Sequence, residues 1–409
     1  MRFRRTWRPG LLFLAGVAAG CGDSSPTAPV PVINGNPAAI PAVMSLRWNE
    51  RARDLVAEHR VDPPMASRDY ALLSLTQYAA VMSAKRTALG IGRPRRAVSV
   101  RAAIMAASAD ALARSFPGDA VFVLNAKAAD AEELSASGEP MDEILAGYEI
   151  GRQAAYAVSV RTYDDGSLNG WSGTVPTGPG YWFSSQNPAT APLRPTWGSV
   201  ATWVMQSGDQ FRPPPPPAFG STEFDAALAE VRRISDSRSA EQTRIAAFWA
   251  DGAGTQTPPG HWNAIAASLI ARDNLNEEEA TRILTVLNAA LIDAGIACWD
   301  AKYHYWVIRP SQADPAITTS VPLPNFPSYV SGHSSFSAAA ALVLGAAFPK
   351  DSASLDAMAH EAALSRLYGG IHYRFDNEHG LALGEAIGKL ALPLLSGDAA
   401  EQKWREVIP

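Results

Sequence analysis

The sequence contains very little cysteine. Its 409 residues include only two, Cys21 and Cys298. If Cys21 is removed or modified during export, no intramolecular disulfide can form. The folded protein must then be stabilised by its hydrophobic core, and a chain with 47% apolar residues can build a sizeable one.

The sequence also has fewer basic than acidic residues. The chain has 35 Lys and Arg against 40 Asp and Glu, which gives a net charge of −5. Proteins that follow nucleic-acid phosphates need a surplus of cationic side chains, so we expect no nucleic-acid partner. Any anion-binding site must therefore be a local cluster of cations on an acidic protein.

The N-terminus lacks an apolar run long enough to span a bilayer. Its apolar stretch covers residues 11–19, against the ~20 residues that a spanning helix needs. Four arginines precede it, as in a signal peptide, which we assign to residues 1–20. The string Val17-Ala18-Ala19-Gly20-Cys21 resembles a bacterial lipoprotein cleavage box. We therefore expect a bacterial exported protein, anchored through a lipid on Cys21 at the periplasmic or extracellular face; the alternative is a plain secretory signal.

β-Hairpin signals are scarce, and helical periodicity dominates the chain. Residues 21–45 are rich in Ser, Pro and Gly, which is typical of a flexible tether. Beyond them, apolar residues recur at spacings of three and four. This pattern predicts helices over residues 46–59, 70–89, 98–115, 120–134, 141–161, 223–235, 240–250, 261–272, 276–308, 333–347, 354–368 and 376–394.

Residues 164–217 break the helical pattern with Gly, Pro, Trp and Ser, and end in five consecutive prolines. So long a segment without helical periodicity is usually functional or an interface strap. We expect its tryptophans to pack onto the helices; they are Trp171, Trp182, Trp197 and Trp203. The predicted fold is all-α, with two helical-bundle halves, 46–222 and 223–409, joined by this Trp/Pro-rich strap.

Three short segments near the C-terminus carry cationic or imidazole side chains at spacings suited to gripping one oxyanion. They are Lys302-x6-Arg309, Ser331-Gly332-His333 and Arg366-x5-His372-x3-Asp376. A buried phosphate or vanadate needs several fixed donors. The cations would give charge-assisted hydrogen bonds, and Ser331 and the Gly332 N–H would give neutral ones. Asp376, four residues after His372, can fix the tautomer of that imidazole.

The local sequence favours convergence of these segments. Pro310 places Arg309 at the end of a helix, and Gly332 opens a helix whose free N–H groups suit an anion. The pair Gly369-Gly370 ends a helix and allows Arg366 and His372 to meet. A zinc site is disfavoured because three neighbouring cations would repel a dication. A serine hydrolase is disfavoured because no G-x-S-x-G elbow is present here.

Together the three segments resemble the superfamily that unites vanadium-dependent haloperoxidases with type 2 phosphatidic acid phosphatases and bacterial acid phosphatases, over roughly residues 240–394. The resemblance implies that the equatorial oxygens of vanadate or phosphate are bound by Lys302, Arg309, Ser331, Gly332 and Arg366. It implies that His372 is the axial vanadium ligand or the phosphorylated nucleophile. It also implies that His333 is the acid–base residue and that Asp376 supports His372.

Further residues resemble the haloperoxidase branch. Trp299 and Phe326 stand where vanadium chloroperoxidases place a Trp and a Phe beside the cofactor. The string around Trp249-Ala250-Asp251-Gly252 is also haloperoxidase-like, and the likeness implies that Asp251 pairs with Arg366. Val330 departs from the family, which usually has Pro before Ser-Gly-His.

The resemblance leaves two enzymatic functions open. The first is a vanadate-dependent haloperoxidase that oxidises halide with hydrogen peroxide at a His-ligated vanadate. The second is an acid phosphatase without a cofactor that hydrolyses phosphomonoesters through a phosphohistidine at the same site. A third, remote alternative is a non-catalytic helical surface protein that binds a partner through the strap. We expect contact with a membrane only through the lipid on Cys21.

Overall fold

The computed structural model describes residues 37–92 and 94–409. Within these residues the chain forms helices, and its β-pairing is limited to isolated bridges. The predicted all-α fold class is therefore confirmed. The predicted signal peptide, Cys21 and most of the predicted tether lie outside the described residues.

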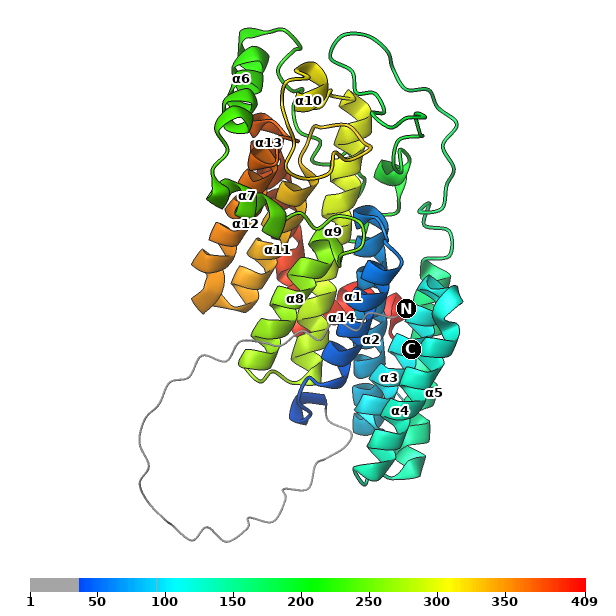
Figure 1. Ribbon diagram of the computed structural model, residues 1–409. Coiled ribbons are helices and arrows are strands. Elements are labelled where there is room, and N and C mark those ends of the chain that lie inside the picture. Colours follow the sequence, from blue (N-terminus) through cyan, green and yellow to red (C-terminus); the bar gives the residue numbers. More distant parts are fainter. Residues whose placement is uncertain (1–36, 93) are drawn as a thin grey trace, which may run out of the picture. The chain divides into compact units, whose positions relative to one another are not determined.

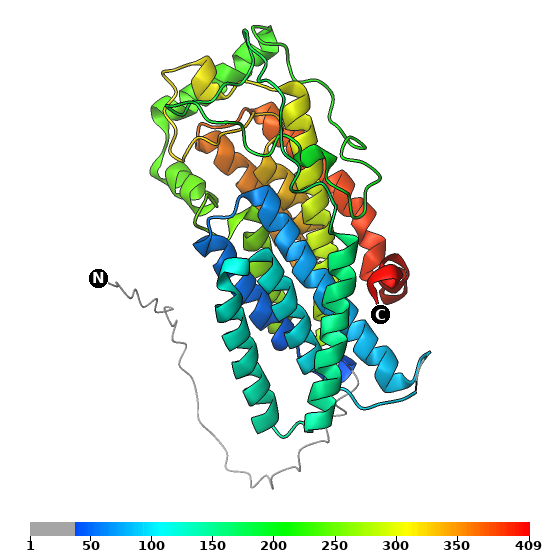
Figure 2. The same cartoon turned by 90° about the vertical axis from the view of Figure 1, so that its right-hand side faces the viewer.

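The first group of helices closely follows the predicted periodicity. Its members are α1 (Met44–Glu58), α2 (Pro63–Leu89), α3 (Val100–Ser115), α4 (Ala120–Ala136) and α5 (Met141–Arg161), with α4 and α5 outermost (Figures 1 and 2). α2 begins seven residues before the predicted start at residue 70. The reason is local, since Pro63 is the first helical residue and the Asp62 side chain accepts a hydrogen bond from Met65 N at 3.1 Å.

The Trp/Pro-rich strap crosses from α5 to the second group of helices (Figure 1). Trp182, Trp197 and Trp203 are buried, and Trp171 lies 6.1 Å from Trp306 between ring centroids. The prediction that the strap tryptophans pack onto the helices is confirmed. The Asp293 carboxylate, on the helix Glu277–Tyr305, also holds the strap, since it accepts hydrogen bonds from the three backbone N–H groups of residues 203–205.

The second group contains the predicted helices and two short ones that the sequence pattern missed. Its members are α6 (Thr222–Ser237), α7 (Ala240–Phe248), α8 (Thr257–Arg272), α9 (Glu277–Tyr305), α10 (Pro310–Ala313), α11 (Gly332–Ala347), α12 (Ser352–Tyr368), α13 (Arg374–Ala391) and α14 (Gly397–Trp404). Helices α10 and α14 were missed because a few residues carry too little periodicity to detect.

α9 is the central helix of the protein (Figure 1). On one side it runs antiparallel to α2, where Thr285 Oγ1 donates to Ser74 O at 2.9 Å and Lys85 pairs with Glu278 at 2.7 Å. On the other side it packs against α11 and α13. Among the described helices, α9 alone is apolar and long enough to cross a membrane, but 94% of its most apolar window is buried within the protein. Its apolar surface is therefore used for packing. The predicted domain boundary near residue 222 stays a prediction.

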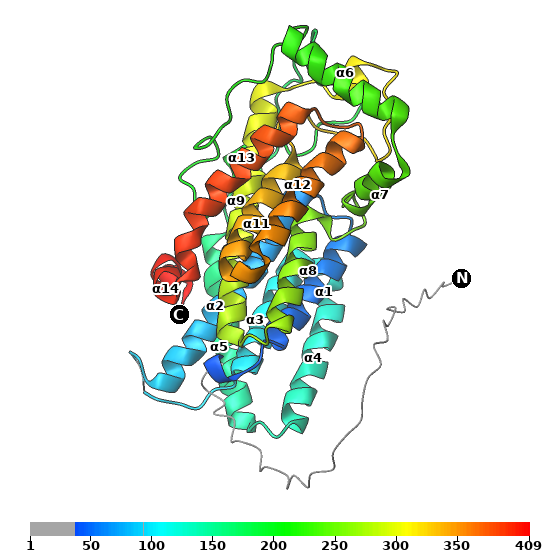
Figure 3. The ribbon, with the colours of Figure 1, turned by 90° about the vertical axis from the view of Figure 1, so that its left-hand side faces the viewer.

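Helices α11, α12 and α13 lie side by side (Figure 3). α13 approaches α11 closely at Gly384, where an added Cβ would lie 2.2 Å from Ser335 O. Near the start of both helices, Ser331 N donates to Asp376 O at 2.9 Å. The crossing therefore brings two of the three predicted oxyanion-binding segments together.

α9 ends at Tyr305, three residues before the predicted end. Trp306 adopts a left-handed conformation with φ 53°, and its N–H donates to Lys302 O at 2.9 Å. The next residues pair with distant backbone, since Ile308 N donates to Gly180 O in the strap at 2.9 Å. These non-local bonds turn the chain out of the helix, so Arg309 projects from a loop.

Candidate active site

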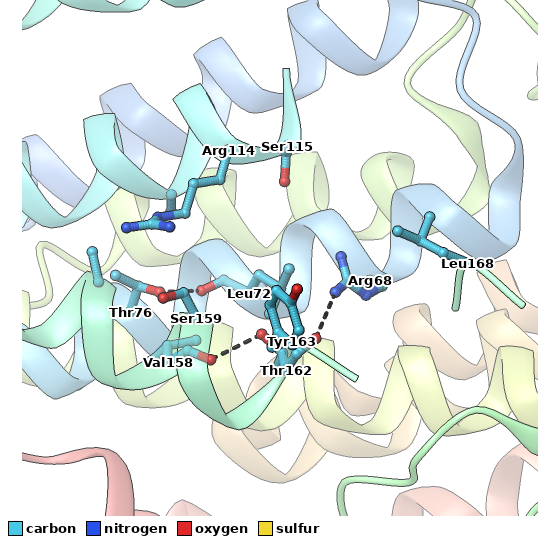
Figure 4. A pocket seen from close by; sticks show the side chains of 12 residues that line it. Arg68, Leu72, Thr76, Arg114, Ser115, Val158, Ser159, Thr162, Tyr163 and Leu168 are labelled. Atoms are coloured by element: carbon cyan, nitrogen blue, oxygen red, sulfur yellow. Dashed lines mark hydrogen bonds between the residues drawn. The ribbon is translucent and has the colours of Figure 1, made fainter. Parts of the chain in front are cut away.

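A cavity with a volume of about 530 Å³ lies at the C-terminal end of α9. Its lining includes Gly332, His333, Arg366 and His372, which come from two of the three predicted segments. Arg309, from the third segment, contacts His372 directly. A smaller cavity of about 290 Å³ lies between α2, α3 and α5 (Figure 4) and contains none of the predicted site residues. We therefore treat the larger cavity as the candidate active site.

Trp299 and Phe326 form a wall of the larger cavity, as their predicted place beside the oxyanion requires. Their ring centroids lie 5.0 Å apart, and both residues line the cavity. Trp299 Nε1 donates to Leu193 O of the strap at 3.2 Å, which fixes the indole ring. The wall is therefore rigid and apolar next to the cationic groups.

His372 is buried and held by Asp376. Its Nδ1 lies 2.8 Å from Asp376 Oδ2, and the same oxygen accepts hydrogen bonds from Ser328 Oγ at 2.5 Å and Tyr373 N at 3.1 Å. An Nδ1–H facing a carboxylate leaves Nε2 unprotonated, so its lone pair can act as an acceptor or a ligand. Burial, followed by the charges of Arg309 and Lys302, lowers the pKa of His372 well below its usual value. The imidazole is therefore neutral and ready to act as a ligand or a nucleophile.

Arg309 lies directly against the Nε2 atom of His372. Its Nη1 is 3.0 Å from His372 Nε2 and donates to Ile371 O at 2.8 Å, while its Nε donates to Phe326 O at 3.0 Å. Its Nη2 is buried and has no hydrogen-bond partner among the described residues. Burial lowers the pKa of Arg309 to about 10, so the guanidinium remains charged at neutral pH. A buried charge with an unused donor requires an acceptor beside His372.

Arg366 adds a second guanidinium at the end of α12. Its Nη2 donates to Ala246 O at 2.7 Å and its Nε donates to Ser365 Oγ at 2.8 Å. Burial lowers its pKa to about 10, and it too stays charged at neutral pH. Because α12 stops in the turn at Gly370, where φ is 75°, Arg366 and His372 face the same cavity as predicted.

His333 lies in the first turn of α11, and its buried Nε2 has no hydrogen-bond partner in the part of the chain that the structure describes. Burial and the charge of Arg366 lower the pKa of His333 well below its usual value. Ser331 caps this helix, its Oγ accepting from Ser334 N at 3.4 Å, while its own N–H donates to Asp376 O. Both the hydroxyl and the N–H of Ser331 therefore already make hydrogen bonds within the protein, and its predicted oxyanion contact stays a prediction.

Lys302 does not line the cavity. It is fully buried, and its Nζ donates to the carbonyl oxygens of Pro327 at 3.0 Å, Ser328 at 2.8 Å and Val330 at 2.5 Å. Burial is the main cause that lowers its pKa. In this structure Lys302 therefore fixes the loop between Phe326 and Ser331, and its predicted direct grip on the oxyanion stays a prediction.

The predicted pairing of Asp251 with Arg366 is not a direct ion pair among the described residues, and it stays a prediction. Asp251 lines the cavity, but its Oδ2 lies 3.1 Å from His261 Nδ1, and no Asp251–Arg366 ion pair occurs among the described residues. The His261 ring stacks on Trp249 with centroids 4.6 Å apart. α8 begins at Thr257, which brings His261 back against the loop that carries Asp251. The sequence offered no signal for this pair except its ten-residue separation.

Ser328 is a second site residue that the sequence analysis did not identify. Its hydroxyl donates to the Asp376 carboxylate and lies 3.5 Å from His372 Nδ1. It stands 48 residues from Asp376, so no spacing pattern connects the two. Its place in the Phe326–Ser331 loop was the only available signal.

The donor set fits a bound oxyanion. Lys302, Arg309 and Arg366 are buried cations. The nearby carboxylates are Asp376, Asp251, which faces His261, and Asp62, which is paired with Arg194. The partnerless atoms Arg309 Nη2 and His333 Nε2 add unused hydrogen-bonding capacity. Within the described residues, no group of three His, Cys, Asp or Glu side chains could hold a metal cation. Excess buried positive charge with unused donors is the arrangement that vanadate or phosphate would satisfy.

Comparison with known proteins points to the same chemistry. The model of the PAP2 superfamily matches residues 283–397, which contain every predicted oxyanion-binding residue. A vanadium chloroperoxidase of Curvularia inaequalis is 25% identical over 187 residues, which cover 36% of this chain and 31% of that enzyme. The match thus spans under a third of that enzyme's length.

Solved structures resemble the chain over nearly its whole described length. The first bacterial vanadium-dependent iodoperoxidase is 26% identical with a TM-score of 0.76, covering 87% of this chain and 97% of that chain. A bacterial vanadium-dependent chloroperoxidase in its holo form is 15% identical with a TM-score of 0.65, covering 87% and 96%, which shows a shared fold. These similarities indicate an enzyme, a peroxidase or a phosphatase. Residues 283–397 thus resemble the PAP2 superfamily, and the fold of the chain is similar to those of vanadium haloperoxidases.

Proposed function

We propose that the protein is a vanadate-dependent haloperoxidase that oxidises a halide with hydrogen peroxide. The observation that carries this proposal is the extent of the likeness to the iodoperoxidase. It covers 97% of that chain, whereas the PAP2 match is confined to residues 283–397. The first group of helices and the strap are thus shared with a haloperoxidase, beyond the segment common to the superfamily.

The residues of the cavity suit vanadate as a cofactor. His372 Nε2 would be the ligand, with Arg309, Arg366 and the Gly332 N–H as donors to the oxygens. Bound vanadate would supply a Lewis acid that activates hydrogen peroxide towards attack by halide. Asp376 keeps the proton of His372 on Nδ1, which preserves the Nε2 lone pair. Lys302 holds the loop that carries Phe326 and Ser328 in register with these groups.

His333 is the acid–base residue in this proposal. Its neutral imidazole and free Nε2 can accept a proton from hydrogen peroxide and return it to the oxygen that leaves as water. The balanced reaction is H2O2 + X⁻ + H⁺ → HOX + H2O. The halide loses two electrons and the peroxide gains them.

Halide oxidation by the purified apo-protein, with and without added orthovanadate, tests the proposal. We expect iodide to be converted to triiodide only when vanadate and hydrogen peroxide are both present. His372→Ala should abolish the activity, because it removes the ligand. A protein that binds vanadate but oxidises neither iodide, bromide nor chloride would overturn the assignment.

The second candidate is an acid phosphatase, and the PAP2 match with a donor set equally suited to phosphate favours it. His372 would attack phosphorus, His333 would protonate the leaving oxygen, and water would then cleave the phosphohistidine. This function predicts hydrolysis of p-nitrophenyl phosphate without a metal, inhibition by vanadate and a trapped phosphate on His372. Comparing both activities in one preparation distinguishes the two candidates.

We also propose that the protein is exported and anchored through a lipid on Cys21, a residue outside the described part of the structure. The support is the basic and apolar N-terminal sequence that ends in Val17-Ala18-Ala19-Gly20-Cys21. Mass spectrometry of the membrane fraction should find diacylglycerol on Cys21. A full-length Cys21→Ser protein that stays in the membrane fraction would contradict the anchor.

A further inference from the structure

The candidate active-site cavity has more room than the proposed cofactor and a halide require. Its volume of about 530 Å³ falls within the ~300–1,000 Å³ of pockets that hold drug-sized organic ligands. Its lining contains many apolar side chains, among them Leu193, Pro258, Pro322, Pro324 and Phe336. An apolar chamber beside a cationic centre suits an organic molecule.

One cation in the lining of this chamber has no partner. Arg60, on the turn between α1 and α2, is exposed and makes no side-chain hydrogen bond or ion pair with any described residue. Two carboxylates of the same lining are already engaged. Asp62 accepts from Arg194 Nε, 2.7 Å from each oxygen, and Asp251 faces His261. The lining therefore offers an unmatched positive charge that would complement an anionic group.

The backbone of Arg60 is held in an unfavourable conformation. Its φ is 53°, in the left-handed region where glycine is favoured, and it follows the end of α1. The turn is closed by Arg60 N donating to Ala57 O at 3.2 Å and Val61 N donating to Val56 O at 3.0 Å. Glycine would adopt this conformation without strain, yet the chain has an arginine here. Strained positions of this kind are common at functional sites, which is a reason to ask what the Arg60 side chain binds.

The loop opposite Arg60 leaves space for its guanidinium. A Cβ added at Gly254 would lie 3.0 Å from Arg60 Nη1, so the guanidinium rests against a residue without a side chain. The neighbouring residues of that loop, Asp251 to Ala253, line the cavity. Arg60 is therefore an exposed side chain that lines the same cavity as His333.

We propose that this cavity binds an aromatic organic acid, with Arg60 holding its carboxylate and its ring lying in the apolar chamber beside His333. The proposal rests on the haloperoxidase function and adds an organic acceptor that is halogenated within the cavity. The balanced reaction is ArH + X⁻ + H2O2 + H⁺ → ArX + 2 H2O. A C–H bond is replaced by a C–X bond, and the ring proton leaves in water. Arg60 thus determines which acceptor is used.

Two acceptors with the same reactive ring test this proposal in the vanadate-loaded enzyme. They are 3-(4-hydroxyphenyl)propanoate and its amide, whose rings are insulated from the head group and react equally with free hypobromite. With bromide and peroxide, we expect kcat/KM for the acid to exceed that for the amide by about tenfold, the effect of one charge-assisted hydrogen bond. Arg60→Gly, which fits the left-handed turn, should reduce this ratio to about one, and Arg60→Lys should retain part of it.

A binding measurement and a matched control variant distinguish a failure of the Arg60 proposal from a failure of the haloperoxidase function. Titration calorimetry of the acid into the unreacted protein should show affinity about tenfold weaker in Arg60→Gly. Arg114→Ala, which removes another exposed and partnerless arginine at the separate cavity, should leave both the ratio and the affinity unchanged. Equal rates for acid and amide in wild type, or a ratio that survives Arg60→Gly, overturn the inference. Absence of vanadate-dependent iodide oxidation without any organic acceptor overturns the haloperoxidase function instead.

Discussion

His372 Nδ1 lies 2.8 Å from Asp376 Oδ2, with both side chains buried. The same four-residue spacing occurs between Asp356 and His360 on α12, where the two side chains are 3.9 Å apart and 73% and 57% exposed. The spacing is therefore not what distinguishes the first pair. Burial and the additional donors to Asp376, from Ser328 and Tyr373, make it a fixed unit.

Asp376→Asn should weaken vanadate binding by about 10- to 100-fold, the usual effect of removing a group that orients a metal ligand. The amide cannot stabilise the Nδ1–H tautomer with a negative charge, so His372 Nε2 becomes a poorer ligand. Isothermal titration of the apo-protein with orthovanadate measures this change. Asp356→Asn removes the carboxylate of the exposed pair and should leave the affinity unchanged. Equal affinities in all three proteins would show that the carboxylate has no part in oxyanion binding.

Arg309→Met should abolish most of the stabilisation that vanadate gives to the fold. The wild-type protein should gain about 2.7 kcal/mol at a vanadate concentration 100 times Kd, because the ligand binds only the folded state. The variant lacks the guanidinium whose Nη2 is partnerless and whose Nη1 lies against His372. Thermal unfolding with and without vanadate measures the difference.

The control for Arg309 is Arg244→Met. Arg244 is an exposed residue of α7 paired with Glu241, and its removal should leave the vanadate-induced shift in Tm intact. If Arg309→Met keeps the full shift, Arg309 is not a donor to the oxyanion.

Local patterns predicted the helices and singled out the three candidate oxyanion-binding segments, because helical periodicity and residue spacing depend only on nearby residues. The bounds of α5 match the prediction, since apolar spacing and its flanking residues fix both ends. The end of α9 did not match, because Trp306 turns under bonds to the distant strap. Helical periodicity cannot register such non-local bonds.

Side-chain partners within the site were harder to predict than the residues themselves. Lys302 was expected to contact an oxyanion, which stays a prediction, and the sequence did not predict that three carbonyl oxygens of the loop at 327–330 hold its ammonium group. Asp251 was expected to pair with Arg366, but α8 places His261 nearer to it. Both outcomes depend on how a loop and a helix meet in three dimensions, and neither spacing nor composition encodes that.

Asp69 should make the stability of the protein depend on pH in a defined direction. It is buried on α2, accepts a hydrogen bond from Ser115 Oγ at 2.8 Å, and burial raises its pKa to about 7 from the ordinary 3.8. Above about pH 4 the Asp69 carboxyl group ionises in the unfolded chain but stays protonated in the folded protein. The stability that its raised pKa provides is therefore fully present below pH ~4, decreases as the pH rises, and is lost by about pH 7. The loss proceeds at about 1.4 kcal/mol per pH unit.

Urea unfolding of Asp69→Asn at pH 4.5 and pH 7 tests this effect. Relative to wild type, the variant should gain about 3 kcal/mol in free energy of unfolding between these two values, because its amide does not titrate. Asp164→Asn, at an exposed position, should show no such gain. A difference between Asp69→Asn and wild type that does not change with pH would mean that Asp69 is ionised in the folded protein.

Gly384→Ala should lower both stability and vanadate affinity. The new Cβ would lie 2.2 Å from Ser335 O and 2.9 Å from Ala338 Cβ, so α13 must move away from α11 at a cost of about 1–3 kcal/mol. That movement would also strain the Ser331 N–Asp376 O bond, which joins two oxyanion-binding segments. Gly118→Ala, where an added Cβ meets no atom within 4 Å, is the matched control and should leave both properties unchanged. Urea unfolding and vanadate titration of the two variants measure both effects. If Gly384→Ala lost stability but kept full vanadate affinity, the α11–α13 crossing would support the fold without setting the geometry of the site.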